Sequence, residues 1–361
     1  MNQYLLVKGT AGLGNRVFVL VTAILYARMC DRTLVVDWSD DFYTNHSGNA
    51  KNTPTQNVFS TLFELKNTPH APSVPEDVLA EGSVYPALWK PVLDLSIDDV
   101  VASDGQLVKA MGQGIFRKYA CNVKHLTYPE DLLIASGYDE EIEALRSLFQ
   151  GEYAHFKNLD KAAIFHEAYQ RYLTLAPPVQ QRLDDFRSAH MAGKSWIGIH
   201  IRKSDKAISY AWYQKALAEH VERYPEAHIF LATDNRDVER EISELYPDNV
   251  LVLDKWLPEP GVAVHGNTDC PDLGEHAVTA LLDICLLASC DYLIYSRTTS
   301  FGRLASYISD RPVARHFDIQ QYNDQRRRTW HERLQTLRNK VNRKASYGVG
   351  WLKLRGILPS G

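Results

Sequence analysis

The sequence lacks the cysteine pattern that a disulfide framework or a zinc site requires. Its five cysteines are an odd number, and no two of them are spaced C-x-x-C. Cys285 and Cys290 lie inside an apolar stretch, where free thiols usually pack as small hydrophobic side chains. We therefore expect neither structural disulfides nor bound zinc.

The sequence also lacks long apolar runs, and we expect no secretory leader. No run approaches the roughly 20 residues that a transmembrane helix needs. The composition, 45% hydrophobic and 23% charged residues, is that of an ordinary globular protein. The chain enters the strand-like "YLLVK" with no basic region or cleavage site before it. We expect a cytoplasmic protein that does not span a membrane.

The net charge of −4 conceals an uneven distribution. Residues 326–355 contain ten Lys or Arg and one acid, Glu332, so this segment carries +9 and the rest of the chain −13. Its apolar residues Trp330, Leu334, Leu337 and Val341 follow helical spacing, and a second basic and apolar patch covers 351–358. The helix either packs on the N-terminal domain or docks peripherally on an anionic membrane face. Nucleic acid is disfavoured because the remaining chain is acidic and has no recognition motif.

Strand-like and helix-like stretches alternate in two blocks along the chain. Apolar strands such as "YLLVK", "TLVVDW", "WIGIHIR", "HIFLAT" and "DYLIYS" are separated by segments of helical length. This pattern is typical of parallel sheets covered by helices on both faces. We predict an α/β fold of two Rossmann-type, doubly wound domains facing a cleft, residues 1–185 and 190–320, followed by a basic helix or tail over 321–361.

The first strand runs into a glycine-rich turn, "GTAGLGNR". It lacks the Lys-Ser or Lys-Thr of a P-loop, and its spacing differs from the dinucleotide fingerprint. A tight strand-to-helix turn would explain the glycines alone. It does not explain two large polar side chains at the start of a helix, above the carboxyl edge of the sheet. We therefore predict that Gly12, Gly14, Asn15 and Arg16 contact a ligand.

A cluster of charged residues follows the first strand of the second block, in "IGIHIRKSDK". Strand alternation places His200 and Arg202 on one face. A forked guanidinium beside the ammonium groups of Lys203 and Lys206 suits a diphosphate. The alternative is a solvated run of charges that follows a strand and binds nothing.

Three features further along could complete a site. The strand "FLAT" ends at Asp234, and Asp283 lies within an otherwise apolar helix. An unpaired carboxylate there would be costly, so Asp283 needs a partner, either a core cation or a ligand. Thr299 and Ser300 begin a helix after the strand "YLIYS". Such a helix end suits phosphate, and a simple Ser/Thr N-cap is the alternative.

The motifs, taken in order, resemble those of the α1,6-fucosyltransferase superfamily of NodZ and core fucosyltransferase. They are "GLGN", "RTLVVDW", H-x-R-x-x-D at 200–205, "LATDN", "LLDICLLASCDYLI" and "TTSFGRLA". The resemblance covers the first 40 residues and about 195–317 well, and the middle poorly. It implies a GT-B-like fold, with GDP-fucose held by the C-terminal domain and the acceptor on the N-terminal side.

The same resemblance implies roles for several residues. Arg202 matches the arginine that binds the β-phosphate, and His200 the histidine beside it. Asp283 matches the carboxylate that reads the guanine edge, and Thr299 or Ser300 the hydroxyl on the diphosphate. Asp234 and the glycine-rich turn would complete the donor site.

The general base does not carry over from the family. Lys206 matches a lysine of core fucosyltransferase, but Tyr210 stands where that enzyme has a catalytic glutamate. Inverting transfer needs a base for the acceptor hydroxyl, and Asp37 and Asp205 are our first candidates, ahead of the acids at 40 and 41. The chain has no D-x-D, so we expect no metal ion. Arg202, with Lys203 or Lys206, and the helix end at 299–300 would neutralise the leaving GDP instead.

The expected activity is transfer of fucose from GDP-fucose to a hydroxyl of an oligosaccharide or glycolipid, with no cofactor besides this donor substrate. Two alternatives stay open. One is a GT-B enzyme that uses another nucleotide sugar, since the guanine assignment depends on Asp283 alone. The other is an inactive sugar-nucleotide or glycan-binding protein, which the missing glutamate would suit.

Overall fold

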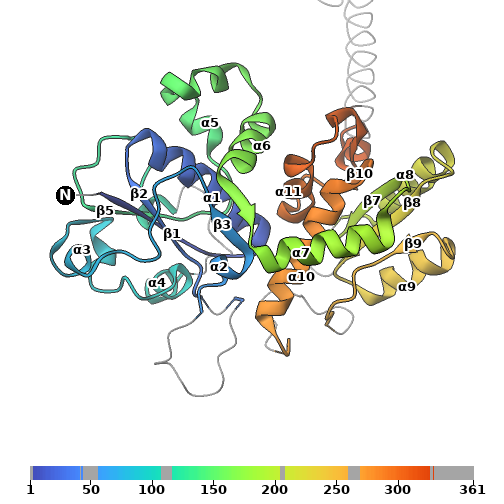
Figure 1. Ribbon diagram of the computed structural model, residues 1–361, viewed down its shortest axis with the longest axis horizontal. Coiled ribbons are helices and arrows are strands. Elements are labelled where there is room, and N and C mark those ends of the chain that lie inside the picture. Colours follow the sequence, from blue (N-terminus) through green and yellow to red (C-terminus); the bar gives the residue numbers. More distant parts are fainter. Residues whose placement is uncertain are drawn as a thin grey trace, which may run out of the picture. The chain divides into compact units, whose positions relative to one another are not determined.

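The computed structural model describes residues 3–40, 42–43, 56–106, 116–203, 208–258, 269–325 and residue 328 (Figure 1). Its contacts group the chain into two compact units, residues 1–317 and 318–361. The elements that position the site described below belong to the first unit. The boundary that we predict near residues 185–190 stays a prediction.

The N-terminal sheet has four parallel strands in the order β2-β1-β5-β4. They are β1 (Tyr4–Lys8), β2 (Thr33–Asp37), β4 (Val84–Tyr85) and β5 (Leu132–Ala135). Alternate residues of β1 enter two separate hydrophobic clusters: Leu5 and Val7 face one, Tyr4 and Leu6 the other. Both faces of the sheet are therefore buried, which explains why the strand sequences are continuously apolar.

The C-terminal sheet has five strands in the order β11-β10-β7-β8-β9. They are β7 (Trp196–Ile201), β8 (His228–Thr233), β9 (Val250–Leu251), β10 (Tyr292–Tyr295) and β11 (His316–Asp318). The central strand β7 is wholly buried and pairs in parallel with β8 and β10. The predicted α/β fold with two parallel sheets is confirmed.

Eleven helices connect and cover the sheets within the described residues. A short antiparallel pair, β3 (Phe63–Leu65) and β6 (Leu173–Leu175), accompanies them. The helices are α1 (Leu13–Met29), α2 (Val58–Leu62), α3 (Glu76–Glu81), α4 (Ile97–Ser103), α5 (Ile142–Leu145), α6 (Lys161–Tyr172), α7 (Pro177–Phe186), α8 (Tyr210–Arg223), α9 (Arg236–Leu245), α10 (Leu273–Ser289) and α11 (Ser300–Ile308).

Packing of α1 against α6 and α11 joins the two sheets through one hydrophobic cluster. The Phe18 ring on α1 meets the Phe165 and Tyr307 rings edge-on, with centroids 5.1 and 5.5 Å apart. Helix α1 is apolar on nearly every face because β1 and β2 cover one side and these helices the other. The same contacts fix the start of α1 beside the start of α11.

The basic tail lies almost entirely outside the described residues. The helical stripe at 330–341 and the patch at 351–358 therefore stay predictions. Of the helices that the structure describes, none combines the length and the apolar character needed to cross a bilayer.

Candidate active site

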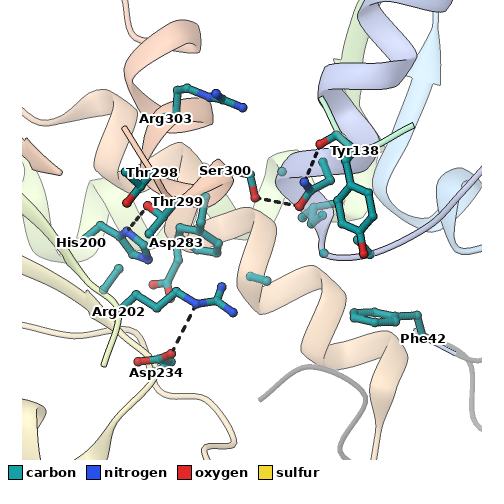
Figure 2. Close-up of a pocket in the computed structure, with 18 of the residues that line it drawn as sticks. Phe42, Tyr138, His200, Arg202, Asp234, Asp283, Thr298, Thr299, Ser300 and Arg303 are labelled. Atoms are coloured by element: carbon teal, nitrogen blue, oxygen red, sulfur yellow. Dashed lines mark hydrogen bonds and ion pairs between the residues drawn. The ribbon is translucent and has the colours of Figure 1, made fainter. Parts of the chain in front are cut away.

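A cavity of about 850 Å³ opens where the carboxyl ends of the parallel strands of both sheets meet (Figure 2). The turn after β1, the ends of β7 and β8, helix α10 and the turn after β10 all contribute to its walls. In open α/β sheets this edge is where ligands bind. The cavity lining includes these residues predicted from the sequence: Gly12, Gly14, Asn15, His200, Arg202, Asp234, Asp283, Thr299 and Ser300.

The N-terminal ends of α1 and α11 meet at this cavity. A Cβ atom on Gly14 would lie 2.7 Å from the Ser300 carbonyl oxygen, so only glycine permits the approach. The Ser300 hydroxyl donates to Asn15 Oδ1 at 2.8 Å, and the Asn15 amide donates to the Tyr138 carbonyl. Asn15 and Ser300 thus tie the two helix ends together.

Neither N-cap residue caps its helix with a side chain, although the Tyr43 hydroxyl accepts from the Leu13 backbone N–H at the start of α1 at 2.9 Å. The N-cap of α1 is Gly12, and the Thr299 hydroxyl at the start of α11 donates instead to the Ser296 carbonyl at 2.9 Å. A side-chain N-cap, the alternative reading of the Thr299 and Ser300 motif, is therefore absent from α11. Uncapped backbone N–H groups and the positive end of the helix dipole favour an anion at this position.

His200 is buried at the end of β7, where its ring stacks on Phe301 with centroids 4.7 Å apart. Its Nδ1 lies 3.4 Å from the Thr299 hydroxyl oxygen (Figure 2). Burial lowers the pKa of His200 to about 3, helped by the nearby charges of Arg202 and Lys255. The imidazole is therefore neutral at physiological pH and adds no charge to the site.

Arg202 extends into the cavity from the end of β7 (Figure 2). Its Nε lies 3.9 Å from Asp234 Oδ2 at the end of β8, and 13% of its side chain is exposed. The other oxygen of Asp234 accepts from the Lys203 backbone N–H at 2.9 Å. Asp234 therefore fixes the strand end from which the guanidinium projects.

Asp283 is buried on α10, with one oxygen paired and one unpaired. Its Oδ2 accepts from the Lys255 ammonium group, whereas Oδ1 has no hydrogen-bond partner among the described residues. Burial raises the pKa of Asp283, and the charge and hydrogen bond of Lys255 oppose that rise. The sequence offered a core cation or a ligand contact as alternatives. The structure shows the cation and also places the carboxylate in the cavity wall.

Arg16 does not line the cavity, contrary to our prediction that it contacts a ligand. Its two terminal nitrogens pair with Asp40 at 2.7 and 2.8 Å, and its Nε donates to the Ala11 carbonyl at 2.9 Å. Ala11 has a φ of +57°, an uncommon conformation for a non-glycine residue. The buried Arg16 therefore stabilises the glycine-rich turn on the side away from the cavity.

Asp37 also lies outside the cavity lining, which argues against it as the general base. The register of β1 and β2 places it beside Lys8, whose ammonium group is 2.6 Å from Asp37 Oδ2. Burial would raise the pKa of Asp37, but Lys8 and Ser39 hold it below the ordinary value. A carboxylate stabilised in this way is a weak base. Asp205 and Lys206 lie outside the described residues.

Several cavity residues carry no signal that we recognised in the sequence. Lys255 follows β9, and Asp98 is the second residue of α4, a helix that begins with an unexceptional Ser96–Asp99 capping box. Phe42 and Tyr138 also line the cavity. All but Lys255 belong to the N-terminal half, and Asp98 and Tyr138 lie in the middle segment, where the family motifs are weakest. Within the described residues, no group of three or more His, Cys, Asp or Glu could hold a metal ion.

Comparison with known proteins gives one consistent result. Residues 160–331 match the family described as Nodulation protein Z (NodZ). Nodulation protein Z of Sinorhizobium fredii is 25% identical over 331 residues, 84% of this chain and 90% of that protein. The chain resembles NodZ. The protein of the same name from Azorhizobium caulinodans is 26% identical over 336 residues, 83% of this chain and 87% of that protein.

Solved structures agree on the fold. A NodZ α1,6-fucosyltransferase crystal soaked with GDP-fucose superposes with a TM-score of 0.55 at 21% identity, covering 86% of this chain and 93% of that one. The structure of FUT1 of Arabidopsis thaliana in complex with GDP superposes with a TM-score of 0.52 at 16% identity. The match covers 88% of this chain and 72% of that one. The predicted GT-B-like fold and the resemblance drawn from the motifs are both confirmed.

Proposed function

We propose that this protein transfers fucose from GDP-fucose to a hydroxyl group of a glycan. One observation carries the proposal. Arg202, the uncapped start of α11 and the half-paired carboxylate of Asp283 line one cavity, in a chain that resembles NodZ over most of its length. A crystal of NodZ α1,6-fucosyltransferase was soaked with GDP-fucose. The diphosphate and the guanine base of this compound suit the cation, the helix end and the carboxylate in the cavity of this chain.

The diphosphate of the donor would lie between Arg202 and the start of α11. The guanidinium offers parallel N–H donors to phosphate oxygens, and Thr299 and Ser300 bring the positive end of a helix to the same region. As the bond between fucose and GDP breaks, negative charge grows on the β-phosphate. Fixed positive groups stabilise this charge without reorganising. Lys206 would assist by the family resemblance.

The guanine base would lie against Asp283. Its N1–H and exocyclic amino group are adjacent donors, and a carboxylate can accept from both. The unpaired Oδ1 of Asp283 is a buried acceptor in need of such a donor, since a buried polar atom is costly when unpaired. The neighbouring charge of Lys255 favours the ionised form of the carboxyl group.

We further propose a single inverting displacement without a metal ion. The sequence contains no D-x-D, and the described residues form no metal-ligand cluster. In this mechanism Arg202 and the helix end neutralise the leaving GDP. An oxocarbenium-like fucosyl group then meets the acceptor oxygen on the opposite face of the sugar.

The basic tail would bring the enzyme to its acceptor. Ten cations accompany a single acid over residues 326–355, and Trp351 and Leu352 could insert into an interface. Each cation close to an anionic leaflet contributes about 1 kcal/mol of attraction. We propose peripheral contact with a cytoplasmic membrane face that carries a glycolipid acceptor.

Two measurements test the proposed function. The first compares the thermal stabilisation of the protein by GDP, UDP, ADP and NAD, and we expect GDP to stabilise it most. The second follows radiolabelled fucose from GDP-fucose into a mixed pool of oligosaccharides. Preference for another nucleotide indicates a different GT-B donor. GDP binding without transfer or donor hydrolysis indicates an inactive sugar-nucleotide-binding protein.

A further inference from the structure

The cavity has a second wall, which the donor assignments leave unused. His200, Arg202, Asp234 and Asp283 lie on one side, and Phe42 and Tyr138 lie across the cavity from them (Figure 2). Asp98, from the start of α4, belongs to the N-terminal half with these two aromatic residues. With the proposed donor against the first wall, this second wall is left to contact an acceptor.

Carboxylates line both walls, and their pairing distinguishes them. Among the described residues five carboxylates line the cavity, and four of them are ion-paired. The pairs are Asp139 with Arg303, Glu140 with Lys161, Asp234 with Arg202, and Asp283 with Lys255. In each of these four pairs a cation of the protein already occupies the carboxylate. The fifth carboxylate is Asp98.

Asp98 makes a single hydrogen bond and no ion pair among the described residues. Its Oδ2 accepts from the Thr10 hydroxyl at 2.8 Å. Thr10 is 1% exposed and belongs to the glycine-rich turn, so the bond ties the carboxylate to a rigid part of the site. Asp98 lines the cavity and is exposed as a residue, and its Oδ1 makes no hydrogen bond among the described residues.

The surroundings of Asp98 make it a better base than an ordinary aspartate. Partial desolvation of the carboxyl group at the cavity wall raises its pKa although the residue as a whole is exposed, and the negative charges of Asp40 and Asp99 act in the same direction. The Thr10 hydroxyl and the more distant Arg16 oppose the rise without cancelling it. Tyr138 also faces this carboxylate, and burial together with the Asp98 charge raises the phenol pKa, so Tyr138 stays neutral.

The aromatic residues that line the cavity with Asp98 suit a sugar ring. Tyr138 is half-buried, its backbone carbonyl accepts from Asn15, and its ring meets Phe116 edge-on at 5.5 Å. Phe42 is half-buried and packs edge-on against Tyr43 at 5.2 Å. Rigid rings bury the apolar face of a sugar at a low cost in side-chain entropy. They would therefore hold an acceptor sugar next to Asp98.

We propose that Asp98 is the general base and that Phe42 and Tyr138 flank the acceptor sugar. The Asp98 carboxylate takes the proton of the acceptor hydroxyl as that oxygen bonds to C1 of fucose. The bond from C1 to the β-phosphate oxygen breaks, and its electron pair leaves with GDP. This inference rests on the proposed function. Asp98, which lines the cavity, takes the place of Asp37 as our candidate for the general base.

The test compares Asp98→Asn with Asp99→Asn in the full-length protein. Asp99 is the adjacent acid on α4, does not line the cavity, and serves the Ser96 capping box. We measure GDP affinity by calorimetry, transfer of radiolabelled fucose to the oligosaccharide pool, and hydrolysis of GDP-fucose without acceptor, in which water replaces the acceptor hydroxyl.

We expect Asp98→Asn to lower kcat for transfer and hydrolysis by about 100-fold or more, with GDP affinity within about twofold of wild type. Asp99→Asn should leave kcat within about threefold. The wild-type rate should also fall at acid pH as Asp98 becomes protonated. In the pH–rate profile of Asp98→Asn this fall at acid pH should be absent.

Other results overturn the inference. Turnover of Asp98→Asn within about threefold of wild type excludes the base role, and loss of GDP affinity makes Asp98 a donor-site residue. An equal loss of kcat in Asp99→Asn shows that the loss comes from a change in α4 and not from the Asp98 carboxylate, which removes the support for the base role. If the wild type neither binds GDP nor consumes GDP-fucose, the proposed function itself fails. If the wild type binds GDP without any turnover, the binding-protein alternative holds and Asp98 has no catalytic role.

Discussion

Replacement of Arg202 by alanine should remove most donor binding while the fold persists. The guanidinium extends from the end of β7 with only 13% of its side chain exposed, so phosphate contacts there are largely shielded from water. Its ion pair with Asp234 is long, at 3.9 Å, and Asp234 keeps its bond from the Lys203 backbone. Asp234 therefore keeps a hydrogen-bond partner in the variant, and we expect the main effect to fall on GDP binding.

The magnitude follows from the bonds lost. A bidentate, charge-assisted contact to phosphate is worth about 2–4 kcal/mol, which corresponds to roughly 30- to 1000-fold in the GDP dissociation constant. Arg202→Lys keeps the charge but loses the planar fork, so its GDP affinity should be intermediate. Transfer should fall at least as far as affinity, because the leaving diphosphate carries more charge in the transition state.

Calorimetric titration with GDP is the assay, and Arg182→Ala is the matched control. Arg182 lies on α7 and forms an exposed ion pair with Glu275 at 2.7 Å, so its loss should change GDP affinity by less than about twofold. Near-normal GDP affinity in Arg202→Ala would refute the diphosphate assignment. A loss in both variants would indicate a change in the fold.

Three other predictions concern Asp283, metal dependence and the basic tail. Asp283→Asn should abolish most GDP binding and lower stability by about 3–5 kcal/mol, because it leaves Lys255 buried without its partner. Adding Lys255→Met should restore the melting temperature but not GDP affinity, and recovery of both would make Asp283 a core residue only. Transfer activity should survive EDTA, and a loss that Mn²⁺ specifically reverses would reveal a metal site. A chain ending at Gly348 should co-sediment less with anionic vesicles at low salt than the full chain. Equal binding of both, or of neither, contradicts membrane docking by the tail.

The sequence predicted the fold and many of the residues that line the cavity because both depend on local patterns. Continuous apolar strands can be buried only on both faces, which indicates parallel sheets. Polar residues at strand ends, such as His200 and Arg202, reach the carboxyl edge in any doubly wound sheet. Asp283 lies within the apolar α10, and an unpaired charge there would be costly in any tertiary arrangement, so the sequence alone indicates that this carboxylate has a partner. These inferences needed only periodicity and the energetic cost of burying charge.

The tertiary structure decided which charges are neutralised inside the protein and which face the cavity. Arg16 and Asp40 lie 24 positions apart, and Thr10 and Asp98 lie 88 apart. No local pattern relates such residues. Strand register placed Lys8 beside Asp37 and removed that acid from consideration as a base. Asp98 and Asp99 look alike in the sequence "SIDD", and only the packing of α4 against the glycine-rich turn separates them. Ion pairing depends on distances of a few ångströms, which chain folding sets and sequence periodicity does not encode.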